Sequence, residues 1–127
     1  TGESAKLADT HGKWGMAPTW GMSQRLPRRI GVVKAKEMMF SGRTISGQEA
    51  VELGIANQCV ADDDLLSAAI EMAESFTLNS WHTLRADKAL INVGQNHFLN
   101  DGLIEERENG PGVAPDMNDR LKAGFKR

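Results

Sequence analysis

The sequence predicts a mixed α/β protein of which this chain is the mostly helical part, with one or two short strands. Apolar residues recur at helical spacing from residue 21 onward, which predicts about six helices. Two short segments, residues 5–9 and 55–60, have the character of strands. Because so few short strands do not form a stable sheet, the chain is either an essentially helical domain or the helical portion of a protein whose sheet is formed by other residues.

Composition limits the classes of function. The 127 residues are 40% hydrophobic and 25% charged, and a formal net charge of -2 gives no field that attracts nucleic acid or an acidic membrane. The single cysteine, Cys59, excludes an internal disulfide and is expected to be a small buried side chain in a reducing compartment. No apolar run approaches the roughly 18 residues that span a bilayer, and no basic-then-apolar leader opens the sequence. Because the sequence has no membrane-length apolar run and a cysteine content typical of a reducing compartment, we expect a soluble, cytoplasmic protein.

The first third of the chain is expected to form one extended stretch, a loop and two helices. Residues 5–9 are extended, and a loop rich in glycine follows to about residue 19. A helix begins near Gly21 and is interrupted or kinked at Pro27. A second helix ends at Gly42, a typical C-terminal helix residue. The residues expected on its apolar face are Val33, Ala35 or Lys36, Met39 and Phe40.

Further helices and one strand are expected beyond this point. Ser46 and Glu49 have the spacing of a capping box, and their helix ends at Gly54. The strand at residues 55–60 precedes a longer helix at residues 61–76, whose acidic first turn faces the positive end of the helix dipole. The residues expected on the buried face of that helix are Leu65, Ala69, Met72 and Phe76. Later helices are expected at residues 81–93, at about residues 98–107 and after Asp116.

His11 is the candidate catalytic residue. It lies in AKLADTHGKWGMAPTWGMSQRLPRRIG, residues 5–31, where glycines permit the backbone to approach a ligand closely. A histidine side chain has an ordinary pKa of about 6.5, so it exchanges a proton near neutral pH. The side chains expected to form an apolar pocket around His11 are Trp14, Met16 and Trp20. From residue types alone, a structural histidine and tryptophans buried in a core are the alternatives.

No metal site is expected from the sequence. The histidines His11, His82 and His97 are scattered, and they are not joined by ligands at a metal-binding spacing. Paired cysteines, a phosphate-binding loop of the G-x-x-x-x-G-K-[ST] type and a G-x-S-x-G motif are also missing from the sequence.

A larger set of residues follows a fixed pattern of spacings. They are Gly15, Pro18, Trp20, Gly21, Ser23-Gln24-Arg25-Leu26, Gly31, Gly42, Ile45, Glu49-Ala50, Gly54-Ile55 and Val60. The pattern is similar to G-x-x-P-G-x-G-G-[ST]-Q-R-L, then R-x-x-G, then T-G-x-x-[IL]-x-A-x-E-A-x-x-x-G-[IL]-x-x-x-V. Residues 4–60 therefore resemble the enoyl-CoA hydratase/isomerase (crotonase) family, while the rest of the chain agrees in helical pattern.

The resemblance implies a crotonase-like superhelix of ββα units followed by a helical region that mediates trimer contacts. Residues 1–62 would be the C-terminal part of the crotonase core with its active-site loop, and residues 63–127 a helical oligomerisation region. The implied substrate is an acyl-CoA thioester, with coenzyme A as part of the substrate and no other cofactor. The implied assembly is a homotrimer or hexamer. Two backbone N–H groups outside this chain would form an oxyanion hole for the thioester oxygen.

The resemblance also places a catalytic position at His11. In the family's hydratases the second catalytic glutamate ends a Q-P-E segment, which falls without a gap on Asp9, Thr10 and His11. An imidazole thus replaces the carboxylate, and His11 is expected to act as general acid or base or to orient the substrate. Thr19 and Met22 replace glycines that are usual in the family and make the loop bulkier.

The implied function is that of an acyl-CoA-processing lyase of the hydratase/isomerase type, active in its full-length form, with this chain inactive alone. The implied substrate-binding residues are Trp14, Met16 and Trp20 along the acyl group, Gly21 at a helix start, and Phe125 and Lys126 near the CoA nucleotide. The alternative is a non-catalytic subunit of the same fold that binds CoA or serves assembly. An independent helical interaction domain is a third interpretation.

Overall fold

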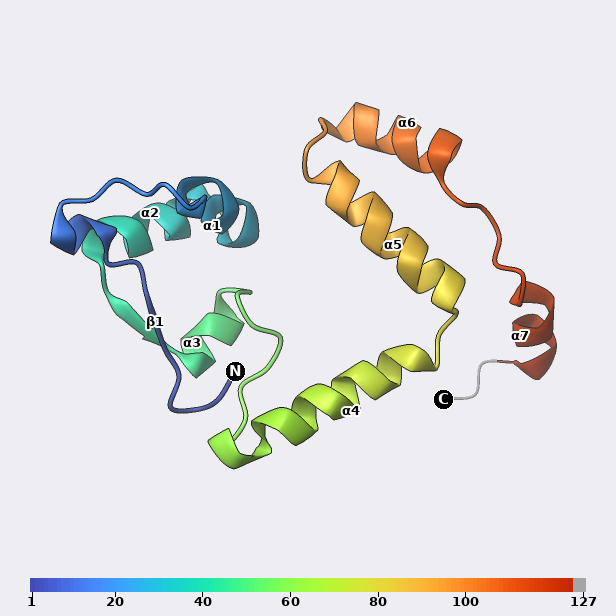
Figure 1. The fold of residues 1–127 in the computed structure, drawn as a ribbon, viewed down its shortest axis with the longest axis horizontal. Helices are drawn as coiled ribbons and strands as arrows, with labels where there is room; N and C mark the ends of the chain where they lie inside the picture. Colours follow the sequence, from blue (N-terminus) through green and yellow to red (C-terminus); the bar gives the residue numbers. More distant parts are fainter. Residues whose placement is uncertain (125–127) are drawn as a thin grey trace. The chain divides into compact units, whose positions relative to one another are not determined.

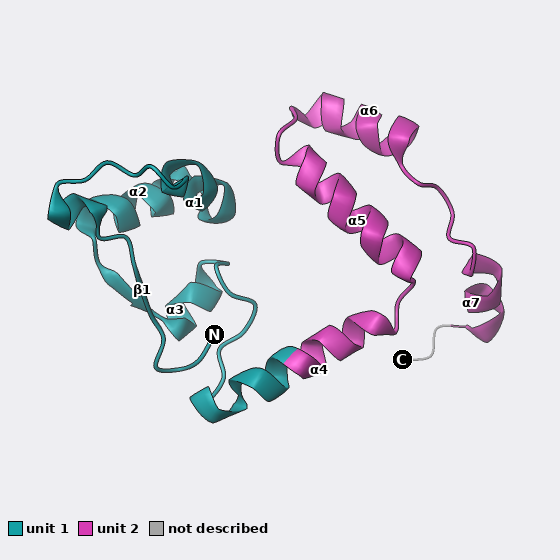
Figure 2. Cartoon of the chain, in the orientation of Figure 1, with its two compact units in different colours: residues 1–69 teal, residues 70–127 magenta. Residues whose placement is uncertain are grey.

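The computed structural model describes residues 1–124. The chain forms two compact units, Thr1–Ala69 and Ile70–Arg127, and the boundary between them falls inside one helix, α4 (Leu65–Thr77) (Figure 2). Among the described residues, no helix is both long and apolar enough to cross a membrane.

The first unit combines a two-stranded antiparallel sheet with short helices (Figure 1). Its strands β1 (Lys6–Ala8) and β2 (Thr44–Ser46) pair so that Leu7 lies opposite Ile45. The other elements are the 3-10 turn η1 (His11–Trp14), α1 (Met22–Ile30), α2 (Val32–Ser41), α3 (Gly47–Glu52), the 3-10 turn η2 (Asp62–Asp64) and the start of α4.

Ile45 is the centre of a small core in this unit. Its side chain is fully buried and packs with Met38 of α2 and Ala50 of α3. The partly buried apolar residues around these three are Leu7, Leu26, Ile30, Leu53, Ile55 and Ala56. The core therefore joins both strands to the helices on either side of β2.

The buried face of α2 agrees with the prediction at Ala35 and differs from it at Val33 and Phe40, while Met39 is half-buried. Ala35 and Met38 are buried, whereas the side chains of Val33 and Phe40 are 79% and 81% exposed. Ala35 and Met38 lie three positions apart, so they share one face of the helix, and Met38 on that face packs with Ile45. The helix carries apolar residues on more than one face, and packing against α1 and against Ile45 of β2 decides which face is buried.

One predicted strand is absent and one observed strand was not predicted. After α3 the chain turns at residues 53–54, bends at residues 55–57 and is irregular at residues 58–59, and Val60 makes an isolated parallel bridge to Gly2. The N–H groups of Ile55 and Ala56 both donate to the carbonyl of Ala50, at 2.8 and 3.1 Å, so they close the end of α3 and are not available to a sheet. The strand that pairs with β1 is β2, which precedes α3. Cys59, expected to be buried, is half-buried.

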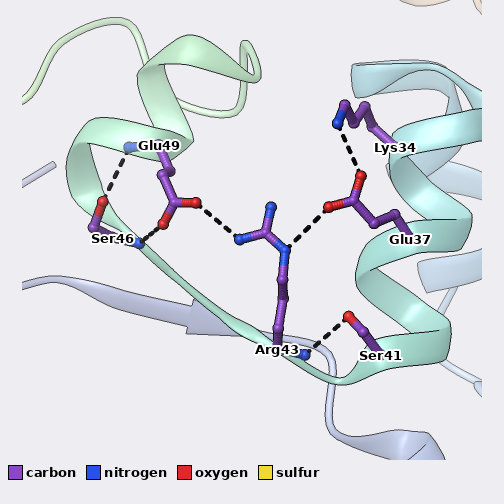
Figure 3. Close-up of polar contacts among 6 residues, drawn as sticks. All are labelled: Lys34, Glu37, Ser41, Arg43, Ser46 and Glu49. Carbon is purple, nitrogen blue, oxygen red and sulfur yellow. Dashed lines mark hydrogen bonds and ion pairs between the residues drawn. The ribbon is translucent and has the colours of Figure 1, made fainter.

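The predicted capping box is confirmed at the start of α3. The Ser46 hydroxyl accepts from the N–H of Glu49 at 3.1 Å, and the Glu49 carboxylate accepts from the N–H of Ser46 at 2.9 Å. Arg43 extends this arrangement, because its guanidinium lies between Glu49 at 2.8 Å and Glu37 of α2 at 3.2 Å (Figure 3). Lys34 binds the other oxygen of Glu37 at 2.8 Å. This series of surface ion pairs links α2 to α3 through Arg43, the residue before β2.

The second unit is helical in its described residues, as predicted. It contains the end of α4, α5 (Trp81–Gly94), α6 (Leu99–Asn109) and α7 (Met117–Ala123). Asp116 precedes α7 and accepts from Arg120 at 2.5 Å and from the buried Ser80 hydroxyl at 2.9 Å. The hydrogen bond from Arg120, followed by that from Ser80, lowers the pKa of Asp116.

The predicted buried stripe of α4 is wrong in this structure. Leu65, Ala69 and Phe76 are exposed and Met72 is half-buried. The apolar spacing gives α4 one hydrophobic face, but within residues 1–124 no element covers that face enough to bury it.

Candidate active site

The candidate site is a tight turn that begins where β1 ends. Asp9 follows the strand, and its Oδ1 accepts from the backbone N–H of His11 at 3.0 Å. This is the local turn that aspartate favours, in which a side chain binds the backbone two residues ahead. The same Oδ1 lies 2.5 Å from Nδ1 of the His11 ring. Asp9 therefore holds both the backbone and the imidazole of His11.

The protonation of this pair follows from the charge of Asp9. The Asp9 side chain is buried, with the residue 3% exposed, and burial by itself raises the pKa of the carboxyl. The hydrogen bonds from the His11 backbone and ring, together with the charge of His11, outweigh this effect, so the pKa of Asp9 is lowered. An ionised carboxylate only accepts hydrogen bonds, so Nδ1 of His11 carries the donated proton. In the neutral ring, Nε2 then has the free lone pair.

Trp20 lies against the histidine ring. The two ring centroids are 5.9 Å apart and the planes are inclined by 59°. The side chain of His11 is 18% exposed, whereas Trp20 is 80% exposed. The imidazole thus has a buried carboxylate and an indole as neighbours, and part of it remains exposed.

Glycine permits the turn to approach the end of α2. Gly42 has a φ of 57°, and a Cβ atom there would lie 2.9 Å from the Lys13 side chain and 3.4 Å from the Asp9 carbonyl oxygen. A larger residue would push the turn away from α2 and strain the backbone. The C-terminal end of α2 therefore contributes to the placement of Asp9 and His11.

The other predicted site residues are distributed over the same loop and the chain end. Trp14 ends η1, and both Trp14 and Met16 are exposed. Gly21 is the N-terminal cap of α1 and has a φ of 92°. Phe125 and Lys126 lie outside the described residues. Of the predicted residues, the structure places His11 and Trp20 in ring contact.

Asp9 is the residue that the sequence analysis missed. The Asp-Thr-His spacing is visible in the sequence, and an aspartate two positions before another residue is typical of a side-chain-to-backbone turn. The burial of Asp9 and the approach of its carboxylate to the ring were not readable from the sequence. They depend on the packing of the turn against α2.

Two further features of the described residues bear on ligands. Within residues 1–124, no group of three His, Cys, Asp or Glu side chains is placed to hold a metal ion. In the second unit, an open groove of about 630 Å³ is lined by residues of α5 and α6 and the segments after them, including Leu90, Ile91, Phe98 and Leu103. The described residues of the predicted site do not line this groove.

Comparison with known proteins defines the class. The family model for enoyl-CoA hydratase/isomerase matches residues 1–109. Enoyl-CoA hydratase from Bacillus anthracis superposes with a TM-score of 0.86 at 38% identity, over 96% of this chain and 48% of that one. Pseudomonas aeruginosa DspI superposes with a TM-score of 0.83 at 27% identity, over 96% of this chain and 47% of that one. The structure is thus part of a crotonase-like α/β fold, as the sequence predicted.

Curated relatives agree with this class. The chain is 36% identical over 104 residues to the Arabidopsis thaliana protein named "Probable enoyl-CoA hydratase 1, peroxisomal". The matched residues are 82% of this chain and 39% of that protein. It is 32% identical over 99 residues to the short-chain-enoyl-CoA hydratase of Clostridioides difficile, over 78% of this chain and 64% of that protein. The chain belongs to the enoyl-CoA hydratase/isomerase family, and it spans between 39% and 64% of the length of these two relatives.

Proposed function

We propose that this chain is the C-terminal half of an acyl-CoA-processing enzyme in which His11 exchanges a proton with the substrate. The observation that carries the proposal is the Asp9–His11 pair, at 2.5 Å, in the segment that resembles the family's Q-P-E sequence. The relatives named as enoyl-CoA hydratases support a CoA thioester as substrate. The reaction class is that of a hydratase/isomerase-like lyase.

In the proposed reaction, the thioester carbonyl is polarised by backbone N–H groups outside this chain, which form an oxyanion hole. Negative charge develops on the thioester oxygen as an enolate forms. His11 acts through Nε2 at the α or β carbon of the acyl group. In hydration, water supplies a hydroxyl to the β carbon and a proton to the α carbon, so His11 serves as base for the water or as acid for the enolate.

The loop around His11 supplies the rest of the proposed substrate site. Trp14, Met16 and Trp20 line the acyl group. Their exposure in this chain leaves apolar surface for an acyl chain or for another segment of the enzyme to cover. Gly21 opens α1, whose dipole points its positive end toward this loop. Coenzyme A enters as part of the substrate, and no separate cofactor is proposed.

The proposed assembly is a cytoplasmic homotrimer or hexamer of the full-length enzyme. Large apolar side chains that a soluble monomer rarely leaves open are exposed in both units, among them Val33, Phe40 and Phe98. Association of subunits or contact with the other half of the enzyme would cover such surface.

Replacement of His11 in the full-length enzyme tests the proposal. His11→Ala should lower kcat by about 10²- to 10⁴-fold, the usual contribution of one general acid or base, with the unfolding transition little changed. His97→Ala is the matched control, since His97 is an exposed histidine of the second unit. His11→Glu restores the carboxylate of the family pattern and should raise hydration of a short enoyl-CoA relative to His11→Ala.

The outcomes separate an enzyme from a binding subunit. Loss of turnover in His11→Ala, with CoA thioester binding retained, supports the proposal. Full activity in His11→Ala assigns His11 a structural role and contradicts it. Binding of CoA thioesters by the unmodified full-length protein without turnover of any enoyl-CoA would instead establish the non-catalytic alternative, which the replacement of glutamate by His11 favours.

A further inference from the structure

Asp9 has more contacts with His11 than a turn requires. A local aspartate turn needs one hydrogen bond, from the backbone N–H two residues ahead, and Oδ1 accepts that bond at 3.0 Å. The same oxygen also engages the ring Nδ1 at 2.5 Å. Among residues 1–124, Oδ2 has no hydrogen-bond partner although the residue is 3% exposed. Among these residues, the hydrogen-bond partners of the buried Asp9 carboxylate are therefore the backbone N–H and the ring of His11.

Burial of a carboxylate with so few partners costs stability, and such a group in a native structure calls for an explanation. Here the negative charge lies beside the one ring that the proposed reaction makes positive. When Nε2 takes up a proton, the imidazolium stands next to the carboxylate, and Nδ1 continues to donate to Oδ1. The Nδ1 proton stays on the His11 ring, since the ionised Asp9 carboxylate acts only as a hydrogen-bond acceptor. The indole of Trp20 lies beside the same ring, at 5.9 Å between centroids.

We propose that Asp9 is the positioning residue of His11: its carboxylate holds the ring so that Nε2 faces the acyl group, and it stabilises the imidazolium that forms there. The inference rests on the proposed function, because Asp9 acts on the reaction through His11. It adds a second side chain to the catalytic machinery, and it makes the Asp-Thr-His segment, rather than a single histidine, the unit that replaces the family's glutamate.

Asp9→Asn separates this role from a structural one. Asparagine keeps an oxygen that accepts the His11 backbone N–H, so it preserves the turn, but it removes the charge. The matched control is Asp62→Asn: Asp62 also accepts a backbone N–H, from Ser4 at 3.2 Å, in the same unit and without a histidine partner. In the full-length enzyme, Asp9→Asn should lower kcat by at least about 10-fold with KM changed by less than about 2-fold. Asp62→Asn should change neither.

A spectroscopic readout on the full-length enzyme is independent of activity. Long-range proton–nitrogen correlation at alkaline pH, where histidine side chains are neutral, reports which ring nitrogen carries hydrogen. His11 should carry it on Nδ1, and Asp9→Asn should weaken that preference, with the rings of His82 and His97 as references in the same spectrum. The measurement on the unmodified enzyme needs no variant to fold.

The results distinguish the two proposals. An Nδ1–H ring for His11, with reduced kcat in Asp9→Asn, supports the positioning role. An Nε2–H ring for His11 in the unmodified enzyme, or unchanged kcat in Asp9→Asn alongside an inactive His11→Ala, overturns it while the proposed function stands. Full activity in His11→Ala overturns the proposed function and the positioning role with it, whatever the ring nitrogen shows.

Discussion

Truncation of Ile45 should destabilise the first unit more than any change on the exposed face of α2. Ile45 is fully buried between Met38 and Ala50. Ile45→Ala removes three buried carbon atoms, at about 0.8 kcal/mol each, or about 2.4 kcal/mol of transfer free energy. The cavity left behind raises the expected loss of unfolding free energy to about 3 to 4 kcal/mol. Ile45→Val, which removes one carbon, should cost about 0.5 to 1.5 kcal/mol.

Urea unfolding followed by the amide NMR signals of the first unit measures these losses. The control is Val33→Ala, because Val33 was expected on the apolar face of α2 but is 79% exposed. That change should alter the unfolding free energy by no more than about 0.5 kcal/mol, since surface substitutions rarely do more and alanine is the better helix former. A cost at Val33 equal to that at Ile45 would refute the assignment of the buried face.

The remaining predictions concern the surface ion pairs and the chain alone. The pKa of Glu49 is lowered mainly by the hydrogen bond from the backbone N–H of Ser46 and then by Arg43. The stabilisation that ionised Glu49 gives the folded state is therefore present above the pKa of Glu49 in the unfolded chain, and it is lost as pH falls through the lower pKa of the folded state. Arg43→Met should therefore reduce the fall in urea midpoint between about pH 7 and about pH 3, and an unchanged fall would contradict the bridge. The 127-residue chain by itself should associate in sedimentation and turn over no enoyl-CoA; a stable monomer or measurable turnover would count against its being half of an enzyme.

The sequence by itself determined the features that depend on neighbours within a few residues. The helices α1, α2 and α5, the capping box of Ser46 and Glu49, and the end of α2 at Gly42 were all predicted. Helix periodicity, caps and left-handed glycines are set by interactions three to four positions apart. The spacing of residues 4–60 also identified the family that the wider comparison confirmed.

The tertiary structure decided what residues distant in the sequence do to one another. It buried Met38 of α2 in place of the predicted Val33 and Phe40, because Met38 packs with Ile45. It paired β1 with β2 and used the amides after α3 to close that helix, so residues 55–60 formed no strand. It also buried Asp9 beside His11 by placing their turn against the end of α2. Burial depends on which surfaces meet, and a local pattern records that a residue is apolar or charged without recording what covers it.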